Sequence, residues 1–281
     1  MSISHHAPTT LNALCACLAE NTEGLSVLGG GTDLTIALRV GNKRPRTILR
    51  LENLPEAQGI RRVGESLEIG SAVTMCELAG DPELTGAYAA LAHAAGEVGS
   101  EQIRSTATLG GNIANAAPGA DTLPPLLLLG AEVLLASPTG VRWCSLESIL
   151  PGGVGLSLSE AIVSIRLPAQ SAGWVSAFHK LGSRKMVTIS RLSLALGFRL
   201  EGNIICDCRA YAGAVGLRPL EVEAAQNLNG LTPDESAAGR LGEALQEFVQ
   251  QTIPGRASMP YKSWAAKAVA ADVMEKLCFV D

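Results

Sequence analysis

The stretch Val27-Leu28-Gly29-Gly30-Gly31-Thr32-Asp33-Leu34 decides how the first part of this chain is interpreted. An apolar run over residues 25–28 ends at three glycines, and residues 32–38 have the pattern of a helix that Thr32 or Asp33 would cap. Such a loop can bring backbone N–H groups close to a ligand and so hold a pyrophosphate without a lysine. The stretch fits neither G-x-G-x-x-G, which needs glycine at position 34, nor a P-loop. A dinucleotide-binding loop and a plain glycine turn therefore both stay open.

The composition is that of a folded protein with a sizeable core. The 281 residues include 47% hydrophobic and 17% charged residues, and the net charge is -5. A negative chain is poorly suited to nucleic acid or to an anionic membrane surface, so we expect neither as a partner. The longest apolar stretch, residues 123–135, is interrupted by Pro124, Pro125 and Glu132, and we expect no membrane span.

The N-terminus and the cysteines favour a cytoplasmic protein. Residues 1–8 carry no Lys or Arg ahead of an apolar segment, so they do not have the pattern of a secretory signal. Seven cysteines include two close pairs, Cys15 with Cys17 and Cys206 with Cys208, and neither pair has C-x-x-C spacing. We therefore expect reduced thiols and no metal or iron–sulfur cluster on this chain.

The order of the predicted elements indicates an α+β protein of two domains. Residues 168–173 form a Pro/Ala/Gln/Ser/Gly cluster that is typical of a boundary, which predicts domains at residues 1–170 and 171–281. The second domain has three β-like runs followed by two helical segments, at residues 174–181, 189–200 and 203–215, then 232–251 and 260–277. This pattern predicts a small antiparallel sheet covered by helices.

A second unusual segment, residues 99–121, is rich in Gly, Asn, Ala and Thr and has almost no charge. It is too long for an ordinary connector, which favours a functional role. Its paired glycines, Gly110 and Gly111, are flanked by Thr and Asn side chains that can donate and accept hydrogen bonds. Asp121 stands where a helix is predicted to begin. From the residues alone, a helix cap and a ligand contact are equally good interpretations of Asp121.

The two segments together resemble the FAD-binding medium subunit of the molybdenum hydroxylases, the family of xanthine and carbon monoxide dehydrogenases. The resemblance rests on G-G-G-T-D-L at residues 29–34 and on V-G-S-x-Q-I-R-x-x-A-T-L-G-G-N-I-A-N-A-x-P-x-A-D-T at residues 98–122. It implies an N-terminal FAD-binding domain of two subdomains, of the PCMH type. A smaller α+β domain with a three-stranded antiparallel sheet and helices would follow.

The resemblance also implies which residues contact FAD. Residues 27–34 would wrap the pyrophosphate and the adenosine side, and a second loop would supply Ala107, Thr108, Gly111, Asn112 and Ala114. Single contacts would come from Val98, from Asp121 at the flavin end, from Ile162 near the adenine and from Lys180 in the second domain. No general base and no metal ligand is expected on this chain.

By resemblance, the chain is an electron-transfer subunit. A large partner would hold molybdopterin and oxidise the substrate, a small partner would hold 2Fe-2S clusters, and the complex would be a dimer of heterotrimers. The acceptor of the electrons stays open among NAD+, a quinone, oxygen and a carrier protein. The segment Arg184 to Ser190 departs from the family pattern and is interpreted as a solvated basic turn. A self-sufficient flavin oxidase and a non-catalytic, flavin-holding assembly protein are the alternative functions.

Overall fold

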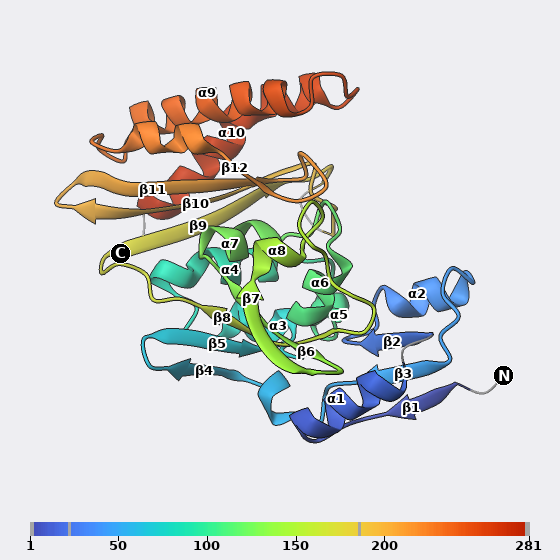
Figure 1. The fold of residues 1–281 in the computed structure, drawn as a ribbon. Coiled ribbons are helices and arrows are strands. Elements are labelled where there is room, and N and C mark those ends of the chain that lie inside the picture. The colour runs from blue at the N-terminus through green and yellow to red at the C-terminus, as the bar shows by residue number, and fades with distance from the viewer. Residues whose placement is uncertain (1–2, 22–23, 185–186, 279–281) are drawn as a thin grey trace. The chain divides into compact units, whose positions relative to one another are not determined.

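The computed structural model describes residues 3–21, 24–184 and 187–278, and the chain divides into two compact units (Figure 1). The first unit holds the described residues of Met1–Glu77, Glu101–Ala116 and Gly130–Ala169, and the second those of Leu78–Ser100, Ala117–Leu129 and Gln170–Asp281. Both units combine helices with β-sheet, which confirms the α+β class. Each unit consists of separate segments of the chain. The units therefore do not test the expected domains at residues 1–170 and 171–281, which stay a prediction.

The first unit begins with a small parallel sheet. Its strands β1 (Ser4–His6), β3 (Thr47–Arg50) and β2 (Leu25–Leu28) are ordered β1-β3-β2. Parallel strands need crossover connections, and helices α1 (Leu11–Glu20) and α2 (Leu34–Arg39) supply them. The Thr10 hydroxyl caps α1 by accepting a hydrogen bond from the Ala13 amide at 3.2 Å. Leu14 and Leu18 of α1 are fully buried in the core of this unit.

A five-stranded antiparallel sheet completes the first unit. Its strands lie in the order β4 (Ile60–Val63), β5 (Ser66–Gly70), β8 (Ala161–Leu167), β6 (Glu132–Ser137) and β7 (Gly140–Ser145). Short helices lie between the strands of this unit: η1 (Pro55–Ala57), the start of α3 (Met75–Gly80), α5 (Glu101–Arg104), α6 (Leu109–Asn115) and α8 (Leu146–Ile149). The Thr74 amide donates to the Glu77 carboxylate at 2.7 Å and the Glu77 amide donates to the Thr74 hydroxyl at 3.2 Å. These two bonds form a capping box.

The second unit is built on an antiparallel sheet with helices on both faces (Figure 1). The sheet order is β12 (Leu220–Glu221), β11 (Ile204–Gly213), β10 (Leu192–Glu201) and β9 (Trp174–Leu181). Helices α9 (Glu235–Thr252) and α10 (Met259–Cys278) cover one face. The other face carries η2 (Gly86–Tyr88), α4 (Ala89–Gly96) and α7 (Leu123–Leu128), and η3 (Glu223–Leu228) follows β12. The central strand β10 is buried from Leu192 to Phe198, as burial on both faces requires.

The second unit differs from the sequence-based expectation by one strand. The three expected strands and the two long helices are present, with ends displaced by a few residues. The sheet has a fourth strand, β12, which pairs through Tyr211 with Glu221 and Ala212 with Leu220. Two residues are too few for an alternating apolar pattern to emerge, so the sequence carries no signal for this strand.

Two glycines of α9 differ in their distance from α10. A Cβ atom added to Gly242 would lie 3.0 Å from the Cα atom of Lys267, so the helices approach closely there. A Cβ atom added to Gly239 would meet nothing within 4 Å. Gly242 is therefore a contact residue between α9 and α10, whereas Gly239 only lowers the helix propensity of α9.

We predict that Gly239→Ala raises the free energy of unfolding by about 0.5–1 kcal/mol, because alanine restricts the unfolded chain and suits a helix interior. Gly242→Ala should lack this gain or lower the stability, because the added methyl group forces α10 outward. Urea denaturation of both variants beside the wild-type chain is the measurement. An equal gain for both substitutions would contradict the close approach at Lys267.

Candidate nucleotide-binding site

Two loops of the first unit meet at their backbones. The first loop, residues 29–33, connects β2 to α2, and the second, residues 105–108, leads into α6. The Thr108 hydroxyl caps α6 by accepting a hydrogen bond from the Gly111 amide at 3.2 Å. The Met75 amide donates to Ala107 O and the Leu109 amide donates to Val73 O, each at 2.9 Å. The second loop is therefore held by backbone bonds on both sides of its turn.

The fold requires the glycines of the first loop, whether or not a ligand is bound. A Cβ atom on Gly30 would lie 1.7 Å from the Thr106 carbonyl oxygen, which no relaxation of a side chain can relieve. A Cβ atom on Gly29 would lie 2.5 Å from the Thr108 hydroxyl oxygen. Gly31 has φ +72, a left-handed conformation that favours glycine. Gly29 and Gly30 therefore allow the two loops to touch, and Gly31 allows the turn of the first loop.

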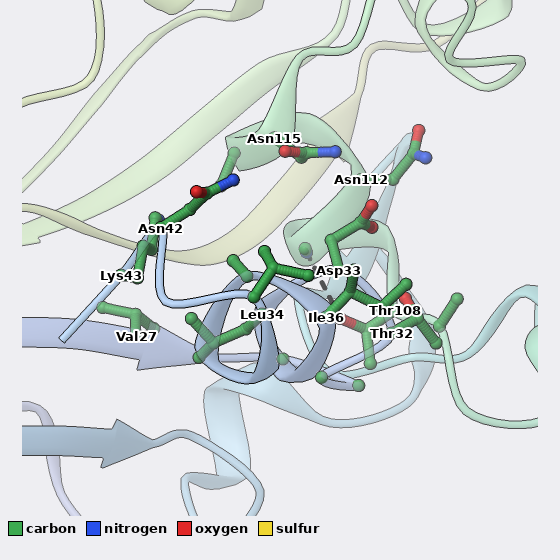
Figure 2. A pocket seen from close by; sticks show the side chains of 18 residues that line it. Val27, Thr32, Asp33, Leu34, Ile36, Asn42, Lys43, Thr108, Asn112 and Asn115 are labelled. Atoms are coloured by element: carbon green, nitrogen blue, oxygen red, sulfur yellow. Dashed lines mark hydrogen bonds between the residues drawn. The ribbon is translucent and has the colours of Figure 1, made fainter. Parts of the chain in front are cut away.

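A cavity of about 420 Å³ opens between the two loops and α2 (Figure 2). Most of the residues that the family resemblance assigns to FAD line it: Val27, Gly29, Gly30, Gly31, Thr32, Asp33, Leu34, Ala107, Thr108, Gly111, Asn112 and Ala114. The remaining lining residues, which the motifs did not indicate as contacts, are Ile36, Ala37, Val40, Asn42, Lys43 and Asn115. The helical period of α2 could have indicated Ile36, Ala37 and Val40, because they follow Asp33 by three, four and seven positions.

A second cavity of about 560 Å³ shares several walls with the first. Its lining includes two of the predicted residues that the first cavity lacks, Leu28 and Ile162. The shared walls are Val27, Gly29, Gly30, Lys43, Thr108, Gly111 and Ala114. The two cavities therefore adjoin along the glycine loops, and the predicted contacts from residues 27–34, 107–114 and 162 lie in one region of the first unit.

Two features of these cavity walls favour the binding of a ligand. Ser71 lines the second cavity, and its hydroxyl oxygen is buried without a hydrogen-bond partner among the described residues. Helix α2 has no buried residue, and Ile36 and Val40, which face the first cavity, are 62% and 61% exposed. A buried hydroxyl without a partner and an uncovered apolar wall both cost free energy in the empty protein. A ligand with polar and aromatic parts would remove both costs.

The backbone N–H groups of the first loop are also available to donate hydrogen bonds to a ligand. Within the described part of the chain, the N–H groups of Gly30, Gly31, Thr32 and Asp33 donate to no protein acceptor. Asp33 is the N-cap residue of α2 but its side chain makes no capping bond. A row of unpaired amides at this place can receive the oxygens of a phosphate group.

The remaining predicted residues, Val98, Asp121 and Lys180, belong to the second unit. Asp121 is not a helix cap, because Thr122 holds the N-cap position of α7. The Asp121 carboxylate instead accepts hydrogen bonds from the Lys180 ammonium at 2.7 Å and from the Ser190 hydroxyl. Burial raises the pKa of Asp121 above the usual value of an aspartate, while the Lys180 charge opposes that rise. Val98 lies two residues beyond α4, and its amide donates to Ala95 O at 3.2 Å.

The Lys180 ammonium has three hydrogens and three protein acceptors. It donates to Asp121 and to Glu97 O at 2.7 Å each, and to Thr188 O at 3.2 Å. In this arrangement no hydrogen of Lys180 is left for a ligand. The expected solvated turn at Arg184 to Ser190 is anchored to the buried pair at two points. Thr188 O accepts a hydrogen bond from Lys180, and the Ser190 hydroxyl donates one to Asp121. Residues 185 and 186 of that turn lie outside the described part of the chain.

Comparison with known proteins agrees with the motif at the two loops. Residues 1–170 match the family model described as the FAD binding domain in molybdopterin dehydrogenase. The chain belongs to this family. The match spans all the segments that make up the first unit, and it includes both loops and both cavities.

Relatives in this family resemble the chain over most of its length. The xanthine dehydrogenase FAD-binding subunit of Escherichia coli O157:H7 is 33% identical over 91% of this chain and 87% of that subunit. The caffeine dehydrogenase subunit beta of Pseudomonas sp. (strain CBB1) is 30% identical over 77% of this chain and 74% of its own. Among solved structures, quinoline 2-oxidoreductase from Pseudomonas putida 86 matches with a TM-score of 0.86 and 26% identity, over 98% of this chain and 96% of that one.

The described residues show two further properties relevant to this family. No group of three or more His, Cys, Asp or Glu side chains among them is placed to hold a metal ion. None of the described helices combines the length and the apolar composition that a membrane crossing needs.

We predict that Asp121→Asn and Lys180→Met each lower the free energy of unfolding by about 3–5 kcal/mol, because each leaves a buried partner uncompensated. The double variant should lose much less than the sum, because both charges are then gone. Urea denaturation of the full chain measures all three. Glu201→Gln, which breaks an exposed ion pair with Arg199 in the same unit, serves as the control and should leave the midpoint unchanged. Additive losses in the double variant would contradict the pair.

Proposed function

We propose that this chain is the FAD-holding, electron-transfer subunit of a molybdopterin-dependent hydroxylase or dehydrogenase complex. The observation that carries the proposal is the pair of adjoining cavities around the two glycine loops. FAD has two ring systems joined through a diphosphate, so it requires two neighbouring spaces and a polar strip between them. The family match over residues 1–170 supports the same cofactor.

The residues present fit this cofactor. The free amides of residues 30–33 and the Thr108 turn would hold the diphosphate, and the apolar side of α2 would cover a ring. Ser71 would give its unpartnered hydroxyl to a polar group in the second cavity, beside Ile162 on the adenosine side. When bound, FAD supplies the electron-transfer chemistry through its isoalloxazine ring. The chain would bind the cofactor, orient it and limit the access of water to it.

The names of the relatives support the proposal that this chain works with partner subunits. Relatives are named as subunits or medium chains of dehydrogenases for xanthine, nicotinate, carbon monoxide and caffeine. Relatives named for such different substrates all resemble this one chain, which supports a substrate site on another subunit. We propose a large molybdopterin subunit, a small subunit with 2Fe-2S clusters, a dimer of heterotrimers and a cytoplasmic location. Val98, Asp121 and Lys180 are proposed to act at the flavin end, with Lys180 acting through Asp121 and Thr188.

We predict that the purified full chain binds one FAD without a covalent bond. Covalent flavins are attached through side chains such as His or Cys, and the described linings of the two cavities contain neither residue. Acid precipitation should leave a colourless pellet and a yellow supernatant. Flavin that stays in the pellet would contradict this expectation, and a chain that takes up no FAD would overturn the proposed cofactor.

We predict that the natively expressed chain co-purifies with a molybdenum subunit and an iron–sulfur subunit, because electrons must enter the flavin from a cluster outside this chain. Size-exclusion chromatography with metal and flavin analysis of each peak is the measurement. A single peak near the 29.1 kDa of the chain that oxidises an organic substrate by itself would instead indicate a self-sufficient flavin oxidase.

A further inference from the structure

Lys43 stands out among the residues around the two cavities. It is the only Lys or Arg among the described residues that line either cavity, and it lines both. The loop pattern in the sequence suggested that a diphosphate could be held here without a lysine. The structure instead places one positive charge at the walls that the two cavities share.

The backbone around Lys43 is fixed by the end of α2. The Asn42 and Lys43 amides both donate to Ala37 O, at 2.9 and 3.2 Å, and Gly41 has φ +78. Figure 2 shows Asn42 and Lys43 together on one side of the first cavity. The turn is therefore set by the helix, and the side chain of Lys43 starts from a defined position.

The charged groups among the described residues leave the Lys43 ammonium without a counter-ion. Lys43 forms no ion pair within the described part of the chain. The two carboxylates of the second cavity are paired with arginines, Glu52 with Arg50 and Glu160 with Arg142 at 2.7 Å. Asp33, the carboxylate of the first cavity, lies on another side of that cavity in Figure 2. A cation that lines a cavity without an acidic partner favours an anionic ligand.

We propose that Lys43 pairs with the diphosphate of the bound dinucleotide and thereby strengthens its binding. This inference rests on the proposed function, because it assigns a residue to the cofactor proposed above. The site would recognise the anionic link of FAD, and neither ring system alone would benefit from the charge. Because Lys43 is exposed, its contribution should be moderate and should fall as salt screens it.

The experiment compares Lys43→Gln with Arg44→Gln in the full chain. Arg44 is the next residue, is also exposed and lines neither cavity, so its substitution removes the same charge from the same turn. Binding of FAD is measured by quenching of flavin fluorescence, with riboflavin as the uncharged ligand and ADP as a competitor. Each titration is run at low salt and at high salt, and Lys43→Arg tests whether a positive charge restores affinity.

At low salt, Lys43→Gln should weaken FAD and ADP by the same factor, about three- to tenfold, and leave riboflavin unchanged. High salt should reduce the difference from wild type, Arg44→Gln should bind as wild type, and Lys43→Arg should recover most of the affinity. Equal binding by Lys43→Gln and wild type, or equal losses for Lys43→Gln and Arg44→Gln, would overturn the role of Lys43 while the proposed cofactor stands. A wild-type chain that binds neither FAD nor ADP would overturn both.

Discussion

The contact between two backbones at Gly30 and Thr106 constrains the whole candidate site. A Cβ atom on Gly30 would lie 1.7 Å from Thr106 O, so only glycine permits the loop after β2 to reach the loop before α6. This contact brings residues 27–34 together with residues 107–114, which are more than seventy positions away in the sequence. Because both cavities share walls from these loops, their shape depends on that contact before any ligand is present.

The sequence predicted the parts of the molecule that depend on short-range patterns. Strand β2, the glycine loop and α2 were expected from residues 25–38, and the capping box at Thr74 and Glu77 has the spacing that the motif requires. The long helices α9 and α10 were expected at residues 232–251 and 260–277, close to where they lie. Local pattern was insufficient for β12, which has only two residues, and for the assembly of each unit from separate segments of the chain.

The roles of Asp121 and Lys180 illustrate what the sequence cannot reveal. The two side chains are separated by 59 positions, yet they form a buried pair at 2.7 Å. The pattern around Asp121 was compatible with a helix cap, but the helix begins one residue later and the carboxylate turns to Lys180 and Ser190. A buried ammonium needs acceptors for all its hydrogens, and Glu97 O and Thr188 O complete the set. Lys180 therefore connects Asp121 to the backbone at Glu97 and Thr188. Contacts between residues so far apart in the sequence cannot be predicted from local spacing.

The glycines and the side chains of the site have separate tasks. Gly29 and Gly30 allow the contact between the loops, so by themselves they cannot select one anionic ligand over another. Selection has to come from groups that face the cavities: the free amides of residues 30–33, the buried Ser71 hydroxyl, the apolar face of α2 and the charge of Lys43. Of these, only the amides belong to the recognisable motif. Affinity for the cofactor can therefore vary between chains that share the same glycine loops.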